Sequence, residues 1–207
     1  MPESKLATRG RPPSTTRAHV SQVALELFVE RGFEETTMDD IAEALGVGRR
    51  TLFRYFDSKN DMVWGDFEWV LHRLRDEFEN VRQVDDLMDA LRQAVVASNT
   101  YPESVLPDLR IRMTFITSIP ALQAHSMIRY AEWRTVVAEF AANRLGQKVD
   151  GLAAQAIGHA ALAASTAAFV RWVRYPDEDL LALLDTSYRM LGDGYDAVAV
   201  EQPSRGI

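Results

Sequence analysis

The residues best suited to chemistry lie between Thr37 and Lys59, in the run TMDDIAEALGVGRRTLFRYFDSK. In this run three arginines, a threonine and aromatic side chains follow a glycine-containing turn. The guanidinium groups of Arg49, Arg50 and Arg54 can form paired hydrogen bonds with guanine edges and bind phosphates, while flat apolar groups can contact thymine methyls. This composition favours recognition of double-stranded DNA in the major groove. The alternative is a basic helix that only faces solvent.

Local signals in the same run predict two helices joined by a tight turn. Thr37 and Asp40 form a Thr-x-x-Asp capping pattern, in which the threonine hydroxyl accepts a hydrogen bond from a backbone N–H one turn later. Gly46 can adopt the left-handed conformation that ends the first helix. The second helix should extend to Phe56, and its Leu52 and Phe56, four residues apart, can face a core. The run is therefore predicted to be a helix-turn-helix.

The run TTMDDIAEALGVGRRTLFRYFDSKNDM resembles the N-terminal domain of the TetR family of bacterial transcriptional regulators, over about residues 15–65. Two later runs, SKNDMVWGDFEWVLHRLRDEF and LQAHSMIRYAEWRTVVAEFAANRLG, resemble regulators encoded beside mycofactocin biosynthesis genes. The expected function is that of a ligand-responsive transcriptional regulator. We expect a repressor that is released from an inverted-repeat operator by an apolar or acyl-type small molecule, such as an acyl-CoA.

The resemblance also implies how individual residues would meet DNA. Arg49 and Arg50 would contact bases or phosphates, and Lys59 would contact a phosphate. Gly48 stands where Ser or Thr usually caps the recognition helix, and Phe53 stands where Tyr is usual, so Phe53 lacks the hydroxyl that could reach a phosphate. The candidate DNA-binding residues are Arg9, Arg11, Thr37, Arg49, Arg50, Thr51, Phe53, Arg54, Tyr55 and Lys59.

Composition agrees with a soluble regulator. The 207-residue chain is 47% apolar and 26% charged, as is typical of globular proteins. Its net charge of −7 belongs to residues 61–207, because residues 1–60 contain nine Lys or Arg and nine Asp or Glu. A DNA-binding protein needs only a local basic face. The start of the chain has no apolar segment typical of a secretory signal, so a cytoplasmic location is expected.

Helix signals continue along the chain and no run favours a strand, so the expected fold class is all-α with about nine helices. Helical spacing from 16 to 31 ends at Gly32, and Ser58 with Asp61 forms a second capping box that opens a long helix to about Val81. Further helices are predicted over 85–99, 104–118, 120–145, 151–174 and 179–198. The expected domains are a flexible basic arm (1–13), a helix-turn-helix DNA-binding domain (14–60), an effector-binding and dimerisation domain (61–200) and a tail (201–207).

The N-terminal arm is rich in Pro, Gly and Ser and contains Arg9 and Arg11. Such a composition is typical of a disordered tail. The functional alternative is an arm whose two arginines enter a minor groove beside the recognition helix.

Residues 152–170 contain no formal charge and are rich in alanine. A membrane span is not expected, because Gln155, His159 and other polar residues interrupt the run and Arg171 follows it. Small residues on one face would instead let another helix approach closely. Two such helices from each of two subunits would form a homodimer interface, as the family resemblance also implies; packing within one subunit is the alternative. The candidate interface residues are Ala156, Ala160, Ala163, Ala167, Leu180, Leu184, Tyr188 and Leu191.

The middle helices carry a surplus of large flexible and aromatic side chains, which form either a core or an apolar pocket. Arg112, His125 and Arg129 accompany them; a dry core would avoid these groups, but they could bind a carboxylate or phosphate head group. A pocket for an apolar or acyl-type effector is therefore predicted. The candidate effector-binding residues are Trp64, Phe67, Arg112, Met113, Ile116, His125, Met127, Arg129, Tyr130, Trp133, Phe169 and Trp172.

No pattern of catalytic residues is present. The histidines at 19, 72, 125 and 159 have no metal-ligand spacing, and no phosphate-binding glycine loop or nucleophile elbow occurs. The absence of cysteine removes thiol catalysis and Cys-rich zinc sites. We therefore expect no enzyme activity, no cofactor and no metal. A small helical enzyme and an architectural DNA-binding protein without a ligand are the alternatives.

Overall fold

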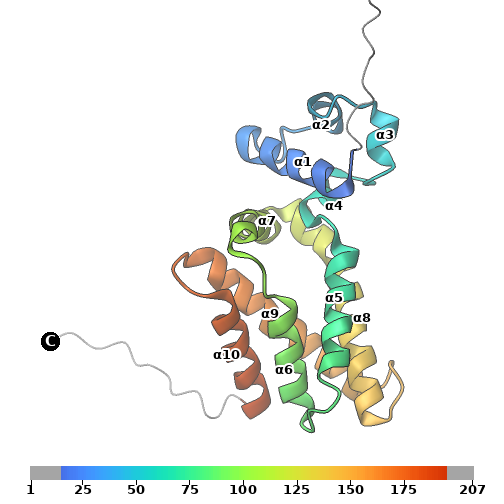
Figure 1. Cartoon of the computed structure of the whole chain (residues 1–207), viewed down its shortest axis with the longest axis vertical. Helices are drawn as coiled ribbons and strands as arrows, with labels where there is room; N and C mark the ends of the chain where they lie inside the picture. Colours follow the sequence, from blue (N-terminus) through green and yellow to red (C-terminus); the bar gives the residue numbers. More distant parts are fainter. Residues whose placement is uncertain (1–14, 195–207) are drawn as a thin grey trace, which may run out of the picture. The chain divides into compact units, whose positions relative to one another are not determined.

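The computed structural model of the chain describes residues 15–194 and consists of two compact units, which meet in sequence between Asp66 and Phe67 (Figure 1). Every regular element in this range is helical, so the predicted all-α class is confirmed, with ten α-helices where about nine were expected. The N-terminal unit contains α1 (Arg17–Arg31), α2 (Met38–Ala44), α3 (Arg49–Phe53) and α4 (Lys59–Trp64). The C-terminal unit contains α5 (Phe67–Asn80), α6 (Leu87–Ser98), a 3₁₀ turn η1 (Glu103–Val105), α7 (Leu106–Ser118), α8 (Pro120–Leu145), α9 (Leu152–Arg174) and α10 (Leu180–Asp193).

The N-terminal unit is built on α1, which packs against both α2 and α4. Its apolar side chains at helical spacing, Val20, Ala24 and Phe28, are almost fully buried, and Phe28 meets Phe33 edge to face at 5.0 Å. Gly32 ends the helix as the sequence predicts, and Thr16 caps its start. This small core holds the helix-turn-helix formed by α2 and α3.

The turn between α2 and α3 has the predicted chemistry. Thr37 and Asp40 form a complete capping box at the start of α2. After α2, Gly46 adopts φ +62°, its N–H donates to the Glu43 carbonyl at 2.9 Å, and the Val47 N–H donates to the Ala42 carbonyl at 3.0 Å. These two bonds are those of a Schellman motif, which a left-handed residue makes possible.

The second helix of the motif is shorter than predicted. α3 ends at Phe53, and the chain tightens so that the Tyr55 N–H donates to the Leu52 carbonyl at 2.9 Å. Leu52 and Phe56 are 0% and 2% exposed, so the predicted core-facing pair is confirmed. Their burial fixes which face of α3 remains outward.

The predicted single helix from Ser58 to Val81 is instead two helices. Ser58 caps α4 as expected, accepting the Asp61 N–H at 3.3 Å. Gly65 then ends α4 with φ +66°, and its N–H donates to the Met62 carbonyl at 3.2 Å. The sequence signal for this break is the glycine itself, because a left-handed turn costs glycine little. The boundary expected after residue 60 therefore falls inside α4, which belongs to the N-terminal unit.

The C-terminal unit is arranged around α9, on which α7, α8 and α10 all pack (Figure 1). At the contact with α8, small side chains bring the two helices close, and a Cβ placed on Gly158 would lie only 3.1 Å from the Arg134 carbonyl oxygen. The buried residues Ala138, Ala141, Ala142 and Ala154 form one cluster there. Close approach through small residues thus occurs within the subunit, on the face of α9 opposite to the exposed Ala156, Ala163 and Ala167.

The apolar stripe of α10 is used inside the subunit, contrary to the prediction that it faces a second copy. Leu180, Leu184 and Tyr188 are buried, at 4%, 0% and 1% exposure. The Tyr188 hydroxyl lies 2.8 Å from the Ser165 hydroxyl and donates to the Ala161 carbonyl at 2.9 Å, both on α9. Burial raises the pKa of Tyr188. The alternative of packing within one subunit is therefore correct for these three residues, while Leu191 remains partly exposed.

By length and composition, α9 is the one helix in the described range that could cross a membrane. It packs along α8 and α10 within the C-terminal unit, and its Trp172 is 2% exposed. Its apolar character is therefore that of a core helix with one face left outward.

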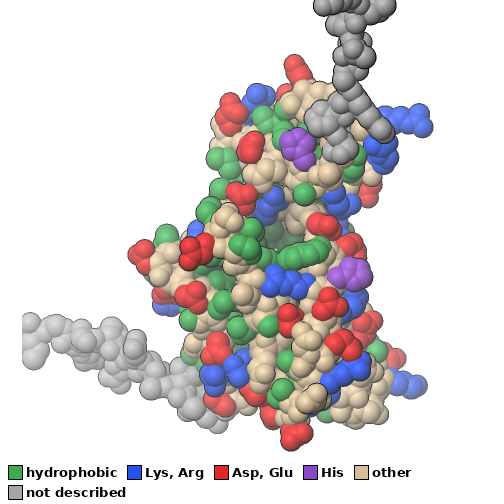
Figure 2. All heavy atoms as spheres, in the orientation of Figure 1, with side chains coloured by type: hydrophobic (Ala, Val, Ile, Leu, Met, Phe, Trp, Pro, Cys, Tyr) green, Lys and Arg blue, Asp and Glu red, His purple; other side chains and the backbone are tan. Residues whose placement is uncertain are grey.

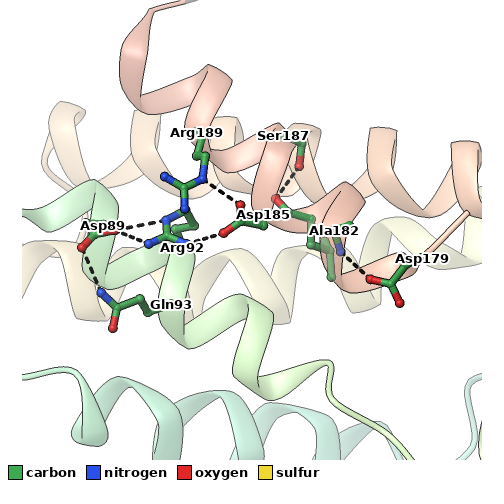
Figure 3. A network of polar contacts seen from close by, with 9 residues as sticks. Asp89, Arg92, Gln93, Asp179, Ala182, Asp185, Ser187 and Arg189 are labelled. Atoms are coloured by element: carbon green, nitrogen blue, oxygen red, sulfur yellow. Dashed lines mark hydrogen bonds and ion pairs between the residues drawn. The ribbon is translucent and has the colours of Figure 1, made fainter. Parts of the chain in front are cut away.

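A polar network joins α6 to α10 at the surface of the C-terminal unit (Figure 3). Arg92 on α6 lies between Asp89, on the same helix, and Asp185 on α10, and it pairs with both carboxylates. Asp185 also accepts from Arg189 at 2.7 Å, and Asp89 accepts from Gln93 at 2.9 Å. Hydrogen bonds from Arg189 and Arg92 hold the pKa of Asp185 below its ordinary value, and Arg92 does the same for the pKa of Asp89.

We expect Arg92→Met to weaken the C-terminal unit at neutral pH and to have little effect in acid. Both carboxyl pKa values are lowered on folding, so their contribution to stability is present above about pH 4, the unfolded value, and is lost as the pH falls through the folded values. The melting temperature at pH 7 should fall by about 2–4 °C, as for a loss of about 1 kcal/mol in a domain of this size. Thermal unfolding of both proteins from pH 7 to 3 checks this.

The matched control is Arg82→Met, because Arg82 pairs with Glu79 on the surface, where both side chains are more than half exposed. That substitution should leave the melting temperature almost unchanged at every pH. The difference between wild type and Arg92→Met should begin to shrink as the pH falls below about 4, and a difference that stays constant from pH 7 to 3 would contradict the role given to the two carboxylates.

Candidate DNA-binding and effector-binding sites

The outward face of α3 is basic and aromatic, as the sequence predicts. Arg49, Arg50 and Arg54 are exposed, Phe53 is 39% exposed, and Thr51 is partly exposed. Figure 2 shows cationic side chains at the surface of the N-terminal unit where α3 lies, and acidic side chains on both units. The basic surface is therefore local to α3.

Arg49 is held by two neighbours on this surface. Its Nη1 donates to the Asp39 carboxylate of α2 at 3.1 Å, and its guanidinium lies 5.5 Å from the centre of the Phe53 ring. The Asp39 and Arg49 side chains are both more than half exposed, so the pair contributes little to stability. It can still set the direction in which the guanidinium fork points, which matters for paired bonds to a base.

Two residues, Arg17 and Tyr55, hold α3 in place. Arg17 donates from Nη1 to the Tyr55 carbonyl at 2.8 Å, and its guanidinium lies 4.3 Å from the centre of the Phe56 ring. The Tyr55 hydroxyl donates to the Thr15 carbonyl at 2.6 Å. These bonds have no local signal in the sequence, because they join segments about forty residues apart. Arg17 and Tyr55 therefore connect the start of α1 to the end of the recognition helix.

The remaining candidates for DNA contact differ in their surroundings. Thr37 is exposed, and its hydroxyl donates to the Asp40 carboxylate at 2.5 Å, which lowers the pKa of Asp40. Lys59 is directed inward: its Nζ donates to the carbonyls of Phe33, Glu34 and Thr36. Arg9 and Arg11 lie outside the described residues.

The predicted effector-binding residues differ in burial and in the unit to which they belong. Phe67, Met113, Ile116 and Trp172 are buried in the C-terminal unit. His125, Arg129, Tyr130, Trp133 and Phe169 are partly buried in the same unit. Two assignments change: Met127 is 59% exposed and faces away from the interior, and Trp64 belongs to the N-terminal unit.

Cationic and polar groups do lie inside the C-terminal unit. Burial lowers the pKa of Arg112, and the nearby Asp108 opposes that shift. The Arg129 side chain is 17% exposed, pairs with Glu132 at 3.1 Å, and lies 5.6 Å from the centre of the Phe67 ring. These are the groups that the sequence marks as out of place in a dry core.

Arg110, which is not among the residues predicted to be functional, covers one face of the Trp172 ring. Its guanidinium lies 4.0 Å from the centre of the Trp172 ring and donates to the carbonyls of Trp172 and Pro176. Trp172 also meets Phe169 edge to face at 6.3 Å. Trp172 is therefore a packed core residue that joins α7 to the end of α9.

Comparison with known proteins identifies the class of this helix-turn-helix protein. Residues 21–63 match the family described as bacterial regulatory proteins, tetR family, and residues 85–196 match the MftR C-terminal domain. A Mycobacterium tuberculosis protein assigned as the mycofactocin biosynthesis transcriptional regulator MftR is 42% identical over 187 residues, covering 90% of this chain and 94% of that protein. This chain belongs to the TetR family. It is therefore a DNA-binding transcriptional regulator, with a C-terminal domain of the MftR type.

Solved TetR-family structures share the fold at lower identity. FadR of Thermus thermophilus, a transcriptional repressor determined in complex with lauroyl-CoA, has a TM-score of 0.54 and 23% identity, covering 93% of this chain and 100% of its own. A Syntrophomonas wolfei protein assigned as a TetR-family regulator has a TM-score of 0.64 and 16% identity, covering 89% and 97%. These similarities establish the TetR architecture independently of the sequence motifs.

The two departures from the TetR pattern have a structural outcome. Gly48 precedes α3 without any side-chain capping bond. Phe53, which has no hydroxyl, presents its ring to Arg49. The recognition helix of this TetR protein thus depends less on its own cap and more on the bonds from Arg17 and Tyr55 described above.

We expect Arg49→Ala and Arg50→Ala to weaken operator binding while leaving the fold intact, because both side chains are exposed on α3. A lost base contact should cost about 1–3 kcal/mol and relax specificity at one position; a lost phosphate contact should weaken all sequences alike and lower the salt slope by about one. Fluorescence anisotropy with operator and scrambled duplexes at several salt concentrations separates the two.

Arg82→Ala serves as the control, since it removes an exposed arginine that follows α5 and lies outside the DNA-binding unit. If both α3 variants bind the operator as tightly as this control, the recognition surface has been assigned to the wrong helix.

Proposed function

We propose that this TetR protein is a cytoplasmic homodimeric repressor, which leaves an inverted-repeat operator when an apolar or acyl-type effector binds in its C-terminal unit. The observation that carries the effector proposal is the partial burial of two arginine side chains, Arg112 and Arg129, among apolar residues of that unit. Arginine head groups beside an apolar lining can orient an anionic ligand while the rest of the ligand packs on the apolar side chains. The proposal gives these cations a ligand head group in addition to their partners within the chain.

The head group would be anionic. Burial disfavours the charged form of Arg112, as its lowered pKa indicates. A carboxylate or phosphate beside the guanidinium would favour its charged form further, in a medium where charge-assisted hydrogen bonds are strong. Arg129, between Glu132 and the Phe67 ring, is a second cation on the same group of helices.

The rest of the effector would be apolar. Phe67, Met113 and Ile116 are buried, and Trp133 and Phe169 are partly buried in the same unit. Ligand sites commonly combine such a lining with a few polar groups that fix orientation. Long-chain or medium-chain acyl compounds have both parts, and lauroyl-CoA is a suitable probe because it binds a protein of the same fold.

The outward face of α9 is the surface proposed for the homodimer. Ala156, Ala163 and Ala167 are exposed along it, between Leu152 at 87% and Val170 at 45% exposure. Ala160 beside them is partly exposed. A single recognition helix reads too few base pairs to specify a genomic site, whereas a two-fold dimer would read both halves of an inverted repeat. The half-site centres would lie about 34–36 Å apart or at a longer groove-compatible spacing.

Replacing Ala163 by Arg should split the dimer and abolish binding to the full operator, because a charge would be buried in a small-residue contact. Ala124→Arg on α8 is the matched control, since Ala124 is also exposed but does not lie on α9. Sedimentation velocity gives the oligomeric state and gel shift gives binding. A variant at Ala163 that still sediments as a dimer would place the interface elsewhere.

Lauroyl-CoA at a hundred times its dissociation constant should stabilise the protein by about 2.7 kcal/mol. Replacing Arg112 by Met should weaken lauroyl-CoA binding by about 10–100-fold, because a charge-assisted hydrogen bond is lost, and should leave binding of uncharged dodecanol unchanged. Thermal shift and tryptophan fluorescence titrations measure both ligands. No stabilisation by acyl compounds, together with Trp133→Ala behaving as an ordinary core deletion, would mean that these residues are only core.

The deciding experiment for the whole proposal is a gel shift with DNA upstream of the protein's own gene, with and without lauroyl-CoA. Shifting the protein from about 99:1 DNA-competent to 1:99 requires a ligand that prefers the incompetent state about 10⁴-fold, roughly 5.5 kcal/mol. A gel shift that is the same with every ligand tested would favour an architectural DNA-binding protein. Turnover of a small substrate, with no gel shift at all, would favour an enzyme.

A further inference from the structure

We propose that Asp39 is a positioning residue for DNA recognition, which holds the Arg49 guanidinium in the direction needed to read a base and limits its use as a general phosphate contact. The proposal rests on the DNA-binding role given to α3 and not on the effector. Its basis is a bond across the helix-turn-helix: the Asp39 carboxylate of α2 accepts from Arg49 Nη1, at the first turn of α3, at 3.1 Å. Asp39 is not among the residues expected to contact DNA.

The carboxylate of Asp39 is not needed to start α2. Two acidic residues, Asp39 and Asp40, stand in the first turn, where the helix dipole favours negative charge. Asp40 is the one engaged in the capping box with Thr37, and it lies 4.0 Å from Arg31. Asp39 takes no part in the cap. Its carboxylate is directed instead to Arg49 on the recognition helix.

Arg49 is held from two helices and can still read a base. Besides the bond from α2, its guanidinium lies 5.5 Å from the centre of the Phe53 ring, one turn along α3. An arginine that is already held loses less rotamer freedom when it forms a paired bond. A guanidinium has five N–H donors, so the bond to Asp39 leaves enough of them for the O6 and N7 atoms of a guanine.

Arg50, the next residue, has a different electrostatic setting. It is exposed and has no carboxylate partner within residues 15–194. Its full charge is therefore available to phosphates, whereas Asp39 and Arg49 together carry no net charge. Affinity for DNA of any sequence increases with the number of phosphates that cations neutralise. The Asp39–Arg49 pair should thus add little to non-specific binding, although the donors of Arg49 remain available to a base.

Asp39 should also penalise a wrong base pair. A carboxylate next to a DNA groove is repelled by the phosphates, and this repulsion is offset best where Arg49 forms its full set of bonds. At a mismatched base pair Arg49 loses those bonds while the repulsion from Asp39 remains. Asp39 would therefore lower the overall affinity and raise the ratio of specific to non-specific binding, which is the quantity that selects a genomic site.

The test uses Asp39→Asn, which keeps the shape of the side chain and removes its charge. Glu43→Gln is the matched control, because Glu43 is exposed one turn further along α2 and forms no ion pair with Arg49 in the described part of the chain. Arg49→Met and the double variant complete a double-mutant cycle. All variants should keep the wild-type melting temperature, since the Asp39 and Arg49 side chains are more than half exposed.

The probe is a duplex that the wild-type full chain selects from a random pool, together with its single base-pair replacements and a scrambled duplex. Fluorescence anisotropy gives the affinity for each duplex at several salt concentrations. The base pair at which Arg49→Met relaxes specificity is taken as the one that Arg49 reads.

For Asp39→Asn we expect discrimination at that base pair to fall about 3–10-fold, as for the partial loss of one paired base contact. Its affinity for the scrambled duplex should increase about 2–5-fold, with a salt slope steeper by up to about 0.9 for the freed arginine. Glu43→Gln should increase all affinities slightly and keep discrimination at every position. In the Arg49→Met background, Asp39→Asn should change no discrimination.

Three results would overturn the proposal. Wild-type discrimination in Asp39→Asn, or the same loss in Glu43→Gln, would leave Asp39 without a positioning role. A loss that is as large in the Arg49→Met background would mean that Asp39 itself contacts a base. If neither Arg49→Met nor Arg50→Met alters binding, α3 is not the recognition helix and both assignments fail together. No effector is present in any of these measurements, so a failure of the proposed effector response leaves the test intact.

Discussion

The last turn of every α-helix leaves carbonyl oxygens without a partner in the helix, and the fold of this protein depends on how these are satisfied. Cationic side chains from distant segments do much of this. Arg17 reaches the end of α3, Arg73 donates to the Ala97 and Thr100 carbonyls after α6, and Arg110 donates to carbonyls at the end of α9. Arg144 donates to Val84 and Asp85 between α5 and α6. The bonds from Arg17, Arg73 and Arg110 each join the end of one helix to another helix, and those from Arg144 join α8 to the loop between α5 and α6.

This use of cations changes how the basic residues should be interpreted. In a DNA-binding unit, every Lys and Arg is a candidate for a phosphate, and the sequence alone cannot separate those that face outward from those that hold the backbone. Arg49, Arg50 and Arg54 remain exposed, whereas Arg17 and Lys59 donate to carbonyls. The basic surface is therefore narrower than the count of basic residues suggests, and it is concentrated on α3.

The features that the sequence predicted correctly depend on neighbours within one or two turns. The capping box at Thr37, the left-handed Gly46 and the burial of Leu52 and Phe56 are all local, and each has a direct spacing signal. The features that it missed depend on residues far apart. An apolar stripe on α10 fits both a dimer interface and packing within one subunit. The structure shows packing within the subunit, because α9 lies beside α10 and its Ser165 meets Tyr188. Gly65 is the exception, because its signal was local and was outweighed by the regular apolar spacing on either side.

The break at Gly65 constrains how an effector signal could reach DNA. A continuous helix from Ser58 to Val81 would carry motion as a rigid rod, but the chain instead passes from α4 to α5 through Gly65 and Asp66. On the N-terminal side, α4 is bonded to α1 by Ser21 and to the α1–α2 connection by Lys59. These bonds make α4 part of the same unit as α1 and the connection that leads into the helix-turn-helix. Because glycine can change its backbone conformation at little cost, we expect the effector response to be more sensitive to substitutions at residues 65 and 66 than at exposed positions of α5.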